Sequence, residues 1–79
     1  MVTVYVLKSL KFKYRYVGIT SDLYDRLERH NGKRSRATAA YAPFELLYSE
    51  EYPTYDLARV REKFLKSGVG RNWLNALKY

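Results

Sequence analysis

The strongest constraint on this chain is that it is short and contains no cysteine. Its 79 residues leave room for one domain, residues 1–79. A domain of this size buries only about 60% of the surface that its unfolded chain exposes. Without cysteine the chain forms no disulfides and offers no thiolate ligands, and its single histidine, His30, excludes a histidine-cluster metal site. Apolar packing must therefore hold the fold together.

The first twenty residues predict an antiparallel β-hairpin. Val2–Leu7 alternates β-branched and aromatic residues, which is typical of a strand, and Tyr14–Thr20 has the same character. The basic connection Lys8–Lys13 is short enough for the two strands to pair directly. Gly18 interrupts the second strand, which indicates either a β-bulge or a close approach by another group.

The residues after this hairpin predict a helix followed by an exposed loop. Ser21 is a good N-cap, and Asp22 suits the first turn of a helix. The helix should end at Asn31-Gly32, and its core-facing side chains should be Leu23, Tyr24 and Leu27. The basic, small and polar stretch 33–40 should form an exposed loop.

The second half of the chain predicts one strand and two helices. Phe44–Tyr52 is the third strand, and Thr54 is the next N-cap. A helix over Asp56–Ser67 should present its apolar side chains to the core and end at two glycines, and a short last helix should follow over Arg71–Lys78. The apolar positions of these two helices are Leu57, Val60, Phe64, Leu65, Trp73, Leu74 and Leu77. The order β-β-α-β-α-α predicts an α+β domain, with a three-stranded, mainly antiparallel sheet flanked by helices.

The charge of the chain points to a polyanionic partner. Fifteen Lys and Arg against eight Asp and Glu give a net charge of +7. Nine tyrosines interleave with the basic residues, a mixture that suits nucleic acid, although the same charge also keeps a small protein soluble. No apolar run is long enough to span a membrane, and no signal peptide is visible, so we expect a cytoplasmic protein.

A few side chains could carry chemistry, and each also has a structural interpretation. Tyr5 and Tyr16 lie on neighbouring strands, where their hydroxyls could meet or their rings could border the core. Arg26 and His30 share one helix face, and His30 could equally serve the helix C-terminus. Glu62 lies among basic residues of its helix, where a surface ion pair with Arg59 or Lys66 is the simplest interpretation.

Taken together, these residues resemble the signature of the GIY-YIG nuclease superfamily. The first element corresponds to Val4-Tyr5, the second corresponds to Tyr16-Val17-Gly18, and Arg26 follows the second tyrosine by ten residues. The segment LARVREKFLKSGVGRNWL is similar to the small single-domain bacterial branch, which itself resembles the N-terminal nuclease domain of the excinuclease nuclease subunit. The chain departs from the family pattern in keeping only the tyrosine of the first element. It also lacks a lysine near Ile19, which the larger members carry.

The resemblance implies an endonuclease that hydrolyses phosphodiester bonds in DNA, with a role in DNA repair. It assigns Glu62 as the ligand of one divalent metal, Mg²⁺ or Mn²⁺, and Arg26 as the clamp on the scissile phosphate. Tyr5, Tyr16 and His30 are the candidates for activating water, and the residues do not decide among them. A tyrosine with its ordinary pKa of about 10 would need that pKa lowered to act as a base. The alternative is a non-catalytic nucleic-acid-binding module with a vestigial site.

The basic residues should contact phosphates without reading sequence, which predicts salt-sensitive binding and selectivity for DNA structure. The expected contacts are Lys8, Lys11, Lys13, Arg15, Lys33, Arg34, Arg36, Lys66 and Arg71. Three aromatic residues nearby could stack on an unpaired base or simply pack: Phe12, Tyr14 and Tyr41. A partner protein could add specificity, and the oligomeric state stays open.

Overall fold

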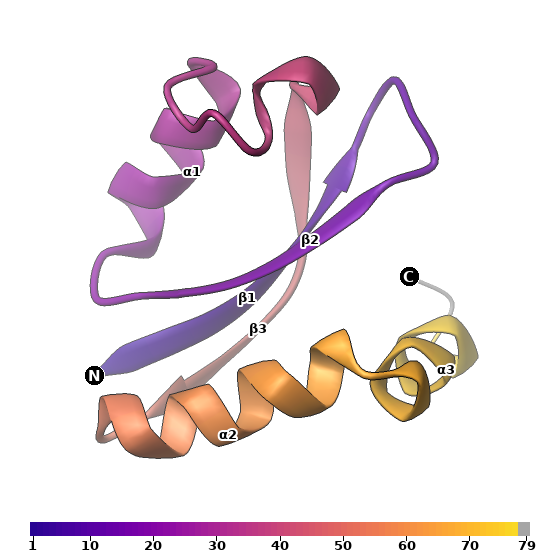
Figure 1. The fold of residues 1–79 in the computed structure, drawn as a ribbon. Coiled ribbons are helices and arrows are strands. Elements are labelled where there is room, and N and C mark those ends of the chain that lie inside the picture. The colour runs from indigo at the N-terminus through magenta and orange to yellow at the C-terminus, as the bar shows by residue number, and fades with distance from the viewer. Residues whose placement is uncertain (78–79) are drawn as a thin grey trace.

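The computed structural model spans the whole chain, and it describes residues 1–77. A three-stranded antiparallel sheet lies at the centre, in the order β2-β1-β3. Helix α1 covers one face of the sheet, and α2 and α3 cover the other (Figure 1). In chain order the elements are β1 (Val2–Ser9), β2 (Arg15–Thr20), α1 (Leu23–Asn31), the short 3₁₀ helix η1 (Ala39–Tyr41), β3 (Phe44–Tyr52), α2 (Tyr55–Lys66) and α3 (Gly68–Ala76). The predicted α+β class and the order β-β-α-β-α-α are confirmed.

Alternation along β1 divides the interior into two small cores. Val2, Val4 and Val6 face α2 and α3, where they pack with residues such as Leu65 and Leu74. Tyr5 and Leu7 face the opposite side, where Phe44 and the leucines of α1 surround them. Fully burying one such side chain stabilises the fold by about 1.5–3 kcal/mol. Because β1 buries side chains on both of its faces, it contributes to both cores at once. A site built around Tyr5 is therefore anchored in the middle of the molecule.

The pairing of β1 with β2 shows why position 18 is a glycine. Their register runs without interruption from Thr3 opposite Thr20 to Lys8 opposite Arg15, and it places Gly18 opposite Tyr5. Of the two interpretations of Gly18, the β-bulge is therefore wrong and the close approach by another group is confirmed. The only irregularity in the pairing of the described strands lies between β1 and β3. A Cβ at position 18 would lie 2.6 Å from the Tyr5 hydroxyl oxygen, so the glycine makes room for that tyrosine.

Helix α1 differs from its prediction at its cap and on one side. Asp22, and not Ser21, is the N-cap, because its carboxylate accepts a hydrogen bond from the Asp25 amide. The Thr20 hydroxyl in turn accepts a hydrogen bond from the Asp22 amide and fixes the turn before the helix. Tyr24 is 74% exposed, so it does not belong to the core, whereas Leu23 and Leu27 pack as expected.

Helix α2 is rotated relative to its prediction. Leu57 and Val60 were expected in the core, but they are 51% and 69% exposed. Leu65 is buried and Phe64 packs partly against the core, as predicted, whereas Ala58 faces the sheet in place of Leu57 and Val60. This rotation turns the partly buried Arg61 and Glu62 toward the body of the protein.

The predicted last helix begins earlier than expected, because Gly68 and Gly70 lie in the first turn of α3. Ser67 serves both helices at their junction. Its hydroxyl oxygen accepts a hydrogen bond from the Gly70 amide, and the hydroxyl donates to the Phe64 carbonyl. Lys78, which was predicted as the end of this helix, lies outside the described residues.

A polar cluster ties β3 to α2. Glu50 on β3 accepts hydrogen bonds from Tyr48, Tyr52 and Arg61, with the two Arg61 contacts at 2.9 and 3.1 Å. Burial alone would raise the pKa of Glu50, but these hydrogen bonds hold it below its ordinary value. The Arg61 guanidinium also lies over the Trp73 ring, at 4.7 Å. The cluster therefore fixes the rotation of α2 against the sheet.

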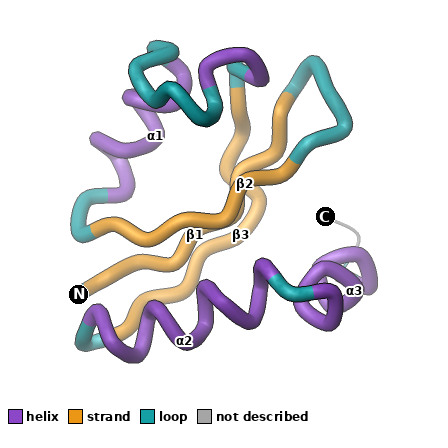
Figure 2. The backbone as a smooth tube through the Cα atoms, viewed as in Figure 1, coloured by secondary structure: helices purple, strands orange, loops and turns teal. Residues whose placement is uncertain are grey.

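Helix α2 contacts the edge strand β2, whereas α1 lies on the opposite side of the sheet and contacts β3 (Figure 2). No helix within residues 1–77 is long and apolar enough to cross a bilayer.

Candidate active site

Two tyrosines of neighbouring strands form the centre of the candidate site. Tyr5 lies opposite Gly18, and Tyr16 lies opposite Leu7, so both side chains project from the same sheet face. Their ring centroids are 6.2 Å apart. Tyr5 is fully buried, whereas Tyr16 is partly exposed, so Tyr16 offers the solvent-accessible ring of the pair.

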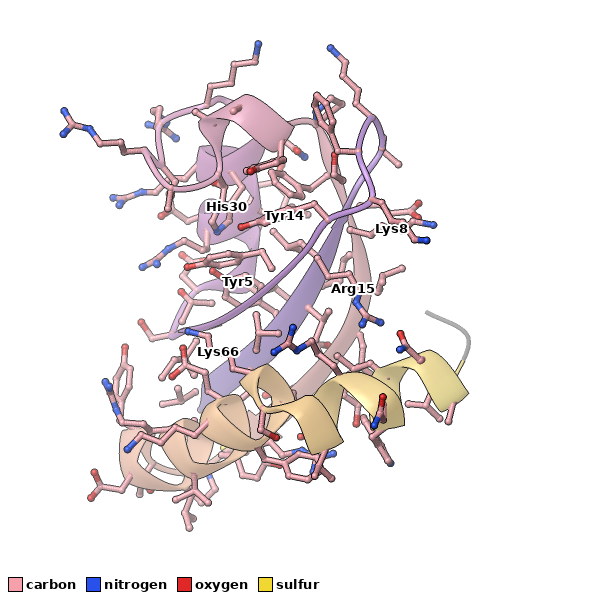
Figure 3. The ribbon with its side chains drawn as sticks, turned by 45° about the vertical axis from the view of Figure 1, so that its right-hand side comes forward. Tyr5, Lys8, Tyr14, Arg15, His30 and Lys66 are labelled. Carbon is pink, nitrogen blue, oxygen red and sulfur yellow. The ribbon has the colours of Figure 1, made fainter. Side chains whose placement is uncertain are left out.

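His30 joins this pair from the last turn of α1. Its Nε2 lies 3.0 Å from the Tyr5 hydroxyl, and its ring lies 4.9 Å from the Tyr16 ring (Figure 3). Burial, with a smaller contribution from the nearby Arg26 charge, lowers the pKa of His30 below its ordinary value. His30 is therefore neutral at physiological pH, with both ring nitrogens held by neighbours.

The second neighbour of His30 is Thr38, which sequence reasoning missed. The Thr38 hydroxyl lies 2.8 Å from Nδ1 of the histidine, and Thr38 is fully buried. The expectation that residues 33–40 form an exposed loop is therefore wrong at this position. The turn is closed by a hydrogen bond from the Thr38 amide to the Ser35 carbonyl. Nothing local marks Thr38, because its partner lies in the preceding helix.

Arg26, one turn before His30, brings a positive charge to the two aromatic side chains. Its charge and a hydrogen bond from its side chain both act to lower the pKa of Tyr5. Its Nε is buried and has no hydrogen-bond partner among residues 1–77. A buried N–H without an acceptor is costly, about 1–3 kcal/mol or more for a charged group, so this donor calls for an acceptor. An anionic oxygen of a ligand would supply one.

The electrostatic balance at Tyr5 favours its protonated form. Burial is the largest cause, and Tyr16 and Glu62 add to it, so the pKa of Tyr5 rises to about 12 despite Arg26. As it stands, Tyr5 is a hydrogen-bond donor and a poor base at neutral pH. The lowered tyrosine pKa that a base role needs is not found at Tyr5.

Glu62 reaches the same site from α2, on the other side of the sheet. Its negative charge is close enough to act on the pKa of Tyr5, and its side chain is only 15% exposed. It pairs with Lys66 at 3.1 Å, so the expected ion pair exists, but the carboxylate itself is mostly buried. No cluster of three or more His, Asp or Glu side chains suited to a metal occurs within residues 1–77. One carboxylate oxygen is nevertheless sufficient for Mg²⁺, which keeps most of its waters and takes further oxygens from a phosphate.

The structure thus groups Tyr5, Tyr16, Arg26 and His30, and it places Glu62 close enough for its charge to act on the pKa of Tyr5. Four of the predicted phosphate-binding residues line one open cleft that adjoins Tyr16: Lys13, Arg15, Lys66 and Arg71. Lys8 lines a smaller neighbouring cleft. The remaining four are exposed and line neither cleft: Lys11, Lys33, Arg34 and Arg36.

The aromatic residues of the hairpin pack on one another. The Tyr14 and Tyr41 rings stack with centroids 3.9 Å apart and planes 8° apart. Phe12 meets Tyr41 edge to face, at 5.7 Å. Packing therefore accounts for the Tyr41 ring and one face of Tyr14.

Comparison with known proteins identifies relatives over most of the chain. The model of the GIY-YIG catalytic domain matches residues 1–75. A UPF0213 protein of Streptococcus sanguinis (strain SK36) is 40% identical over 52 residues, a match that spans 65% of this chain and 60% of that protein. The solution NMR structure of a UPF0213 protein from Bacillus halodurans superposes with a TM-score of 0.58 at 29% identity, over 99% of this chain and 86% of the other.

Proposed function

This chain belongs to the GIY-YIG family, and from that premise we propose that it is a divalent-metal-dependent endonuclease that hydrolyses phosphodiester bonds in DNA. The observation that carries the proposal is the convergence on Tyr5 of three groups from two helices, namely Arg26 and His30 from α1 and Glu62 from α2. Hydrolysis of a phosphodiester needs a group that takes a proton from water, a cation on the phosphate and help for the leaving oxygen. Each of these needs has a candidate within the cluster.

Glu62 would hold the metal, Mg²⁺ or Mn²⁺. When bound, such an ion would polarise a phosphate oxygen and stabilise the negative charge on the leaving oxygen, which takes its proton from solvent as the P–O bond breaks. The donor set suits such an ion, because a single hard carboxylate leaves room for waters and phosphate oxygens. Lys66 neutralises the same carboxylate at 3.1 Å and would have to yield part of this contact.

Arg26 would hold the scissile phosphate. A guanidinium remains charged throughout the reaction and offers several donors in a rigid fork. The buried Nε, without a partner among residues 1–77, supports this role, because a phosphate oxygen would satisfy it. The same charge then opposes the negative charge that grows on the phosphate as water attacks.

The proton of the attacking water would pass through Tyr5 to His30. The water O–H bond breaks as its proton moves to the Tyr5 oxygen, while Tyr5 gives its own proton to Nε2 of His30. The 3.0 Å contact between Tyr5 and His30 supports this relay, and a neutral His30 is able to accept. Tyr16, which is partly exposed, would donate a hydrogen bond to the phosphate.

Substrate selection would depend on structure and not on base sequence. The basic residues around the site suit phosphate contacts, which carry no sequence information. A domain of 79 residues has little surface left for reading bases, so a partner protein could supply further specificity.

The proposal is tested by a cleavage screen over plasmid, branched and flapped DNA, and matching RNA, with Mg²⁺ or Mn²⁺. Glu62→Gln should lower the rate by about a hundredfold or more, because it removes the metal ligand. Glu51→Gln, an exposed glutamate on β3, is the matched control and should retain the full rate.

Two outcomes would contradict the proposal. Equal rates for the wild type and Glu62→Gln would assign the cleavage to a contaminant. Salt-sensitive DNA binding without cleavage of any substrate would favour the non-catalytic binding module, for which the neutralising contact of Lys66 with Glu62 is the supporting observation.

A further inference from the structure

An open basic cleft lies between the edge strand β2 and the two helices α2 and α3. Its volume is about 500 Å³, and its cationic lining residues come from three elements: Lys13 and Arg15 from the hairpin, Lys66 from α2 and Arg71 from α3. None of the described lining residues is acidic. The floor is formed by buried apolar residues, including Leu65 and Leu74. Figure 3 labels two of these lining residues, Arg15 on the strand side and Lys66 on the helix side.

The cleft is continuous with the candidate active site. Tyr16 lines the cleft, and its ring lies 4.9 Å from the His30 ring. Lys66 also lines the cleft and pairs with Glu62. At the other end a smaller cleft of about 280 Å³ shares Lys13 with the first and adds Lys8. A row of positive charge therefore leads from the catalytic cluster along β2 to the hairpin.

We propose that this cleft binds one strand of nucleic acid on one side of the scissile phosphate, an inference that rests on the proposed nuclease function. A phosphate seated at Arg26 has neighbouring phosphates along its strand, and those on the cleft side meet the cations of the cleft. The volume is that of a small-molecule site, which is enough for part of one strand. On this proposal, the segment next to the cut is unpaired on this side.

The positions of the remaining cations make the site asymmetric. Lys33, Arg34 and Arg36 are exposed in the segment after α1, and they line neither cleft. Charge on the cleft side is confined in a groove with an apolar floor, whereas charge on the α1 side is spread over an open surface. On the cleft side, contacts with the nucleic-acid strand therefore depend on fixed positions of the cations, whereas on the α1 side they do not.

The first experiment measures binding without divalent metal, so that cleavage plays no part. Fluorescence anisotropy of a labelled single-stranded oligonucleotide is followed against salt for the wild type, Lys13→Ala and Arg71→Ala. Each lost phosphate contact on a single strand lowers the slope of log affinity against log salt concentration by about 0.7. The loss of affinity between about 50 and 200 mM salt should therefore be about 2.6-fold smaller in each variant than in the wild type. The matched control is Lys63→Ala, an exposed lysine of α2 that does not line the cleft and should leave the slope unchanged.

Lys66 is left out of this comparison because it also contacts Glu62. The proposal is overturned if Lys63→Ala changes the slope as much as Arg71→Ala does. It is also overturned if polyglutamate competes as well as the oligonucleotide, because the cleft would then bind any polyanion.

The second experiment locates the strand relative to the cut. Cleavable substrates carry uncharged methylphosphonate linkages on either the 5′ or the 3′ side of the scissile bond. The wild type should show a raised KM for one of the two substrates only, and Arg71→Ala should remove that difference. An equal effect on both sides would overturn the proposal. If no substrate is cleaved but the first experiment gives the expected slopes, the nuclease function fails while the cleft remains a single-strand site.

Discussion

At the scale of single residues, the candidate site depends on one buried polar chain, Tyr5–His30–Thr38. Its links measure 3.0 and 2.8 Å, and all three residues are buried. A neutral histidine can hydrogen-bond at both nitrogens inside a protein, whereas a protonated one must be solvated or paired with an anion. The charged groups that act on His30 and Tyr5 include Arg26, which opposes protonation of the histidine.

The lowered pKa of His30 predicts a loss of stability in weak acid. Below about pH 6.5 the unfolded chain takes up a proton on His30 while the folded protein does not, so the free energy of unfolding falls as the pH falls. The loss attributable to His30 should reach at most about 1.4 kcal/mol by about pH 5.5. Urea unfolding of the wild type and His30→Gln at about pH 7.5 and about pH 5.5 measures it, because the variant lacks this dependence. The same pH dependence in both proteins would contradict the assignment.

Gly18 predicts a coupled effect on stability and catalysis. In Gly18→Ala the new methyl group would meet the Tyr5 hydroxyl at 2.6 Å and the Tyr16 ring at 2.9 Å. Relieving these contacts should cost about 1–3 kcal/mol of unfolding free energy. The displaced tyrosines should slow cleavage about a hundredfold, since misplacement by about 1 Å is enough for such a loss. Urea unfolding and single-turnover cleavage measure the two effects, and wild-type cleavage in a folded Gly18→Ala protein would refute the role of Tyr5.

At the scale of elements, the junction of α2 and α3 depends on two glycines with opposite surroundings. A Cβ at position 70 would lie 1.9 Å from the Phe64 carbonyl oxygen, and backbone atoms cannot move aside as a flexible side chain can. A Cβ at position 68 would meet nothing within 4 Å. No glycine among residues 1–77 has a positive φ, so the difference between the two is one of space and not of backbone conformation.

This contrast predicts substitutions of opposite sign. Gly70→Ala should destabilise the protein by about 2–4 kcal/mol, because α3 must move away from α2. Gly68→Ala should stabilise it by about 0.4–1 kcal/mol, because alanine restricts the unfolded chain and suits a helix. Thermal or urea unfolding of the two variants measures both values. A similar loss of stability in both variants would contradict the specific contact at Gly70, because it would mean that the start of α3 tolerates no side chain at all.

The strands could be predicted from the sequence more fully than the orientation of the helices. Alternation along β1 assigns each residue to a face, and the structure follows it, with valines on one side and Tyr5 on the other. In α2 the apolar positions Leu57 and Val60 suggested the wrong inward face. The helix instead turns Glu62 inward, because the contacts of Arg61 with Glu50 set its rotation. Such a pairing between residues on different elements cannot be read from the hydrophobic periodicity of the helix.

The same limit applies to the site. The family motif was sufficient to name Tyr5, Tyr16, Arg26 and Glu62, and their convergence follows from the pairing of β1 with β2 and from the helices on either side. Thr38 could not be named, because a threonine in a basic loop looks like many others until its contact with His30 is known.

At the scale of the whole molecule, the candidate site is shared between the two faces of the sheet. Arg26 and His30 come from α1, which packs on one face, and Glu62 comes from α2, which packs on the other. The central strand β1 contributes to both cores, with Val4 and Val6 in one and Tyr5 in the other. The site therefore exists only while both layers are docked, and neither layer contains it alone.

This arrangement predicts that activity and folding are lost together. Trp73, the single tryptophan, packs against Tyr48 and Arg61 on the α2–α3 side, so its fluorescence reports the layer that carries Glu62. In the proposed mechanism, cleavage also depends on the α1 layer, which carries Arg26 and His30. A small domain that unfolds in one step should lose both signals with the same urea midpoint, measured at substrate concentrations too low to stabilise the folded state. Loss of cleavage at a lower urea concentration than the fluorescence change would contradict this, because it would mean that α1 separates from the sheet while α2 and α3 remain folded.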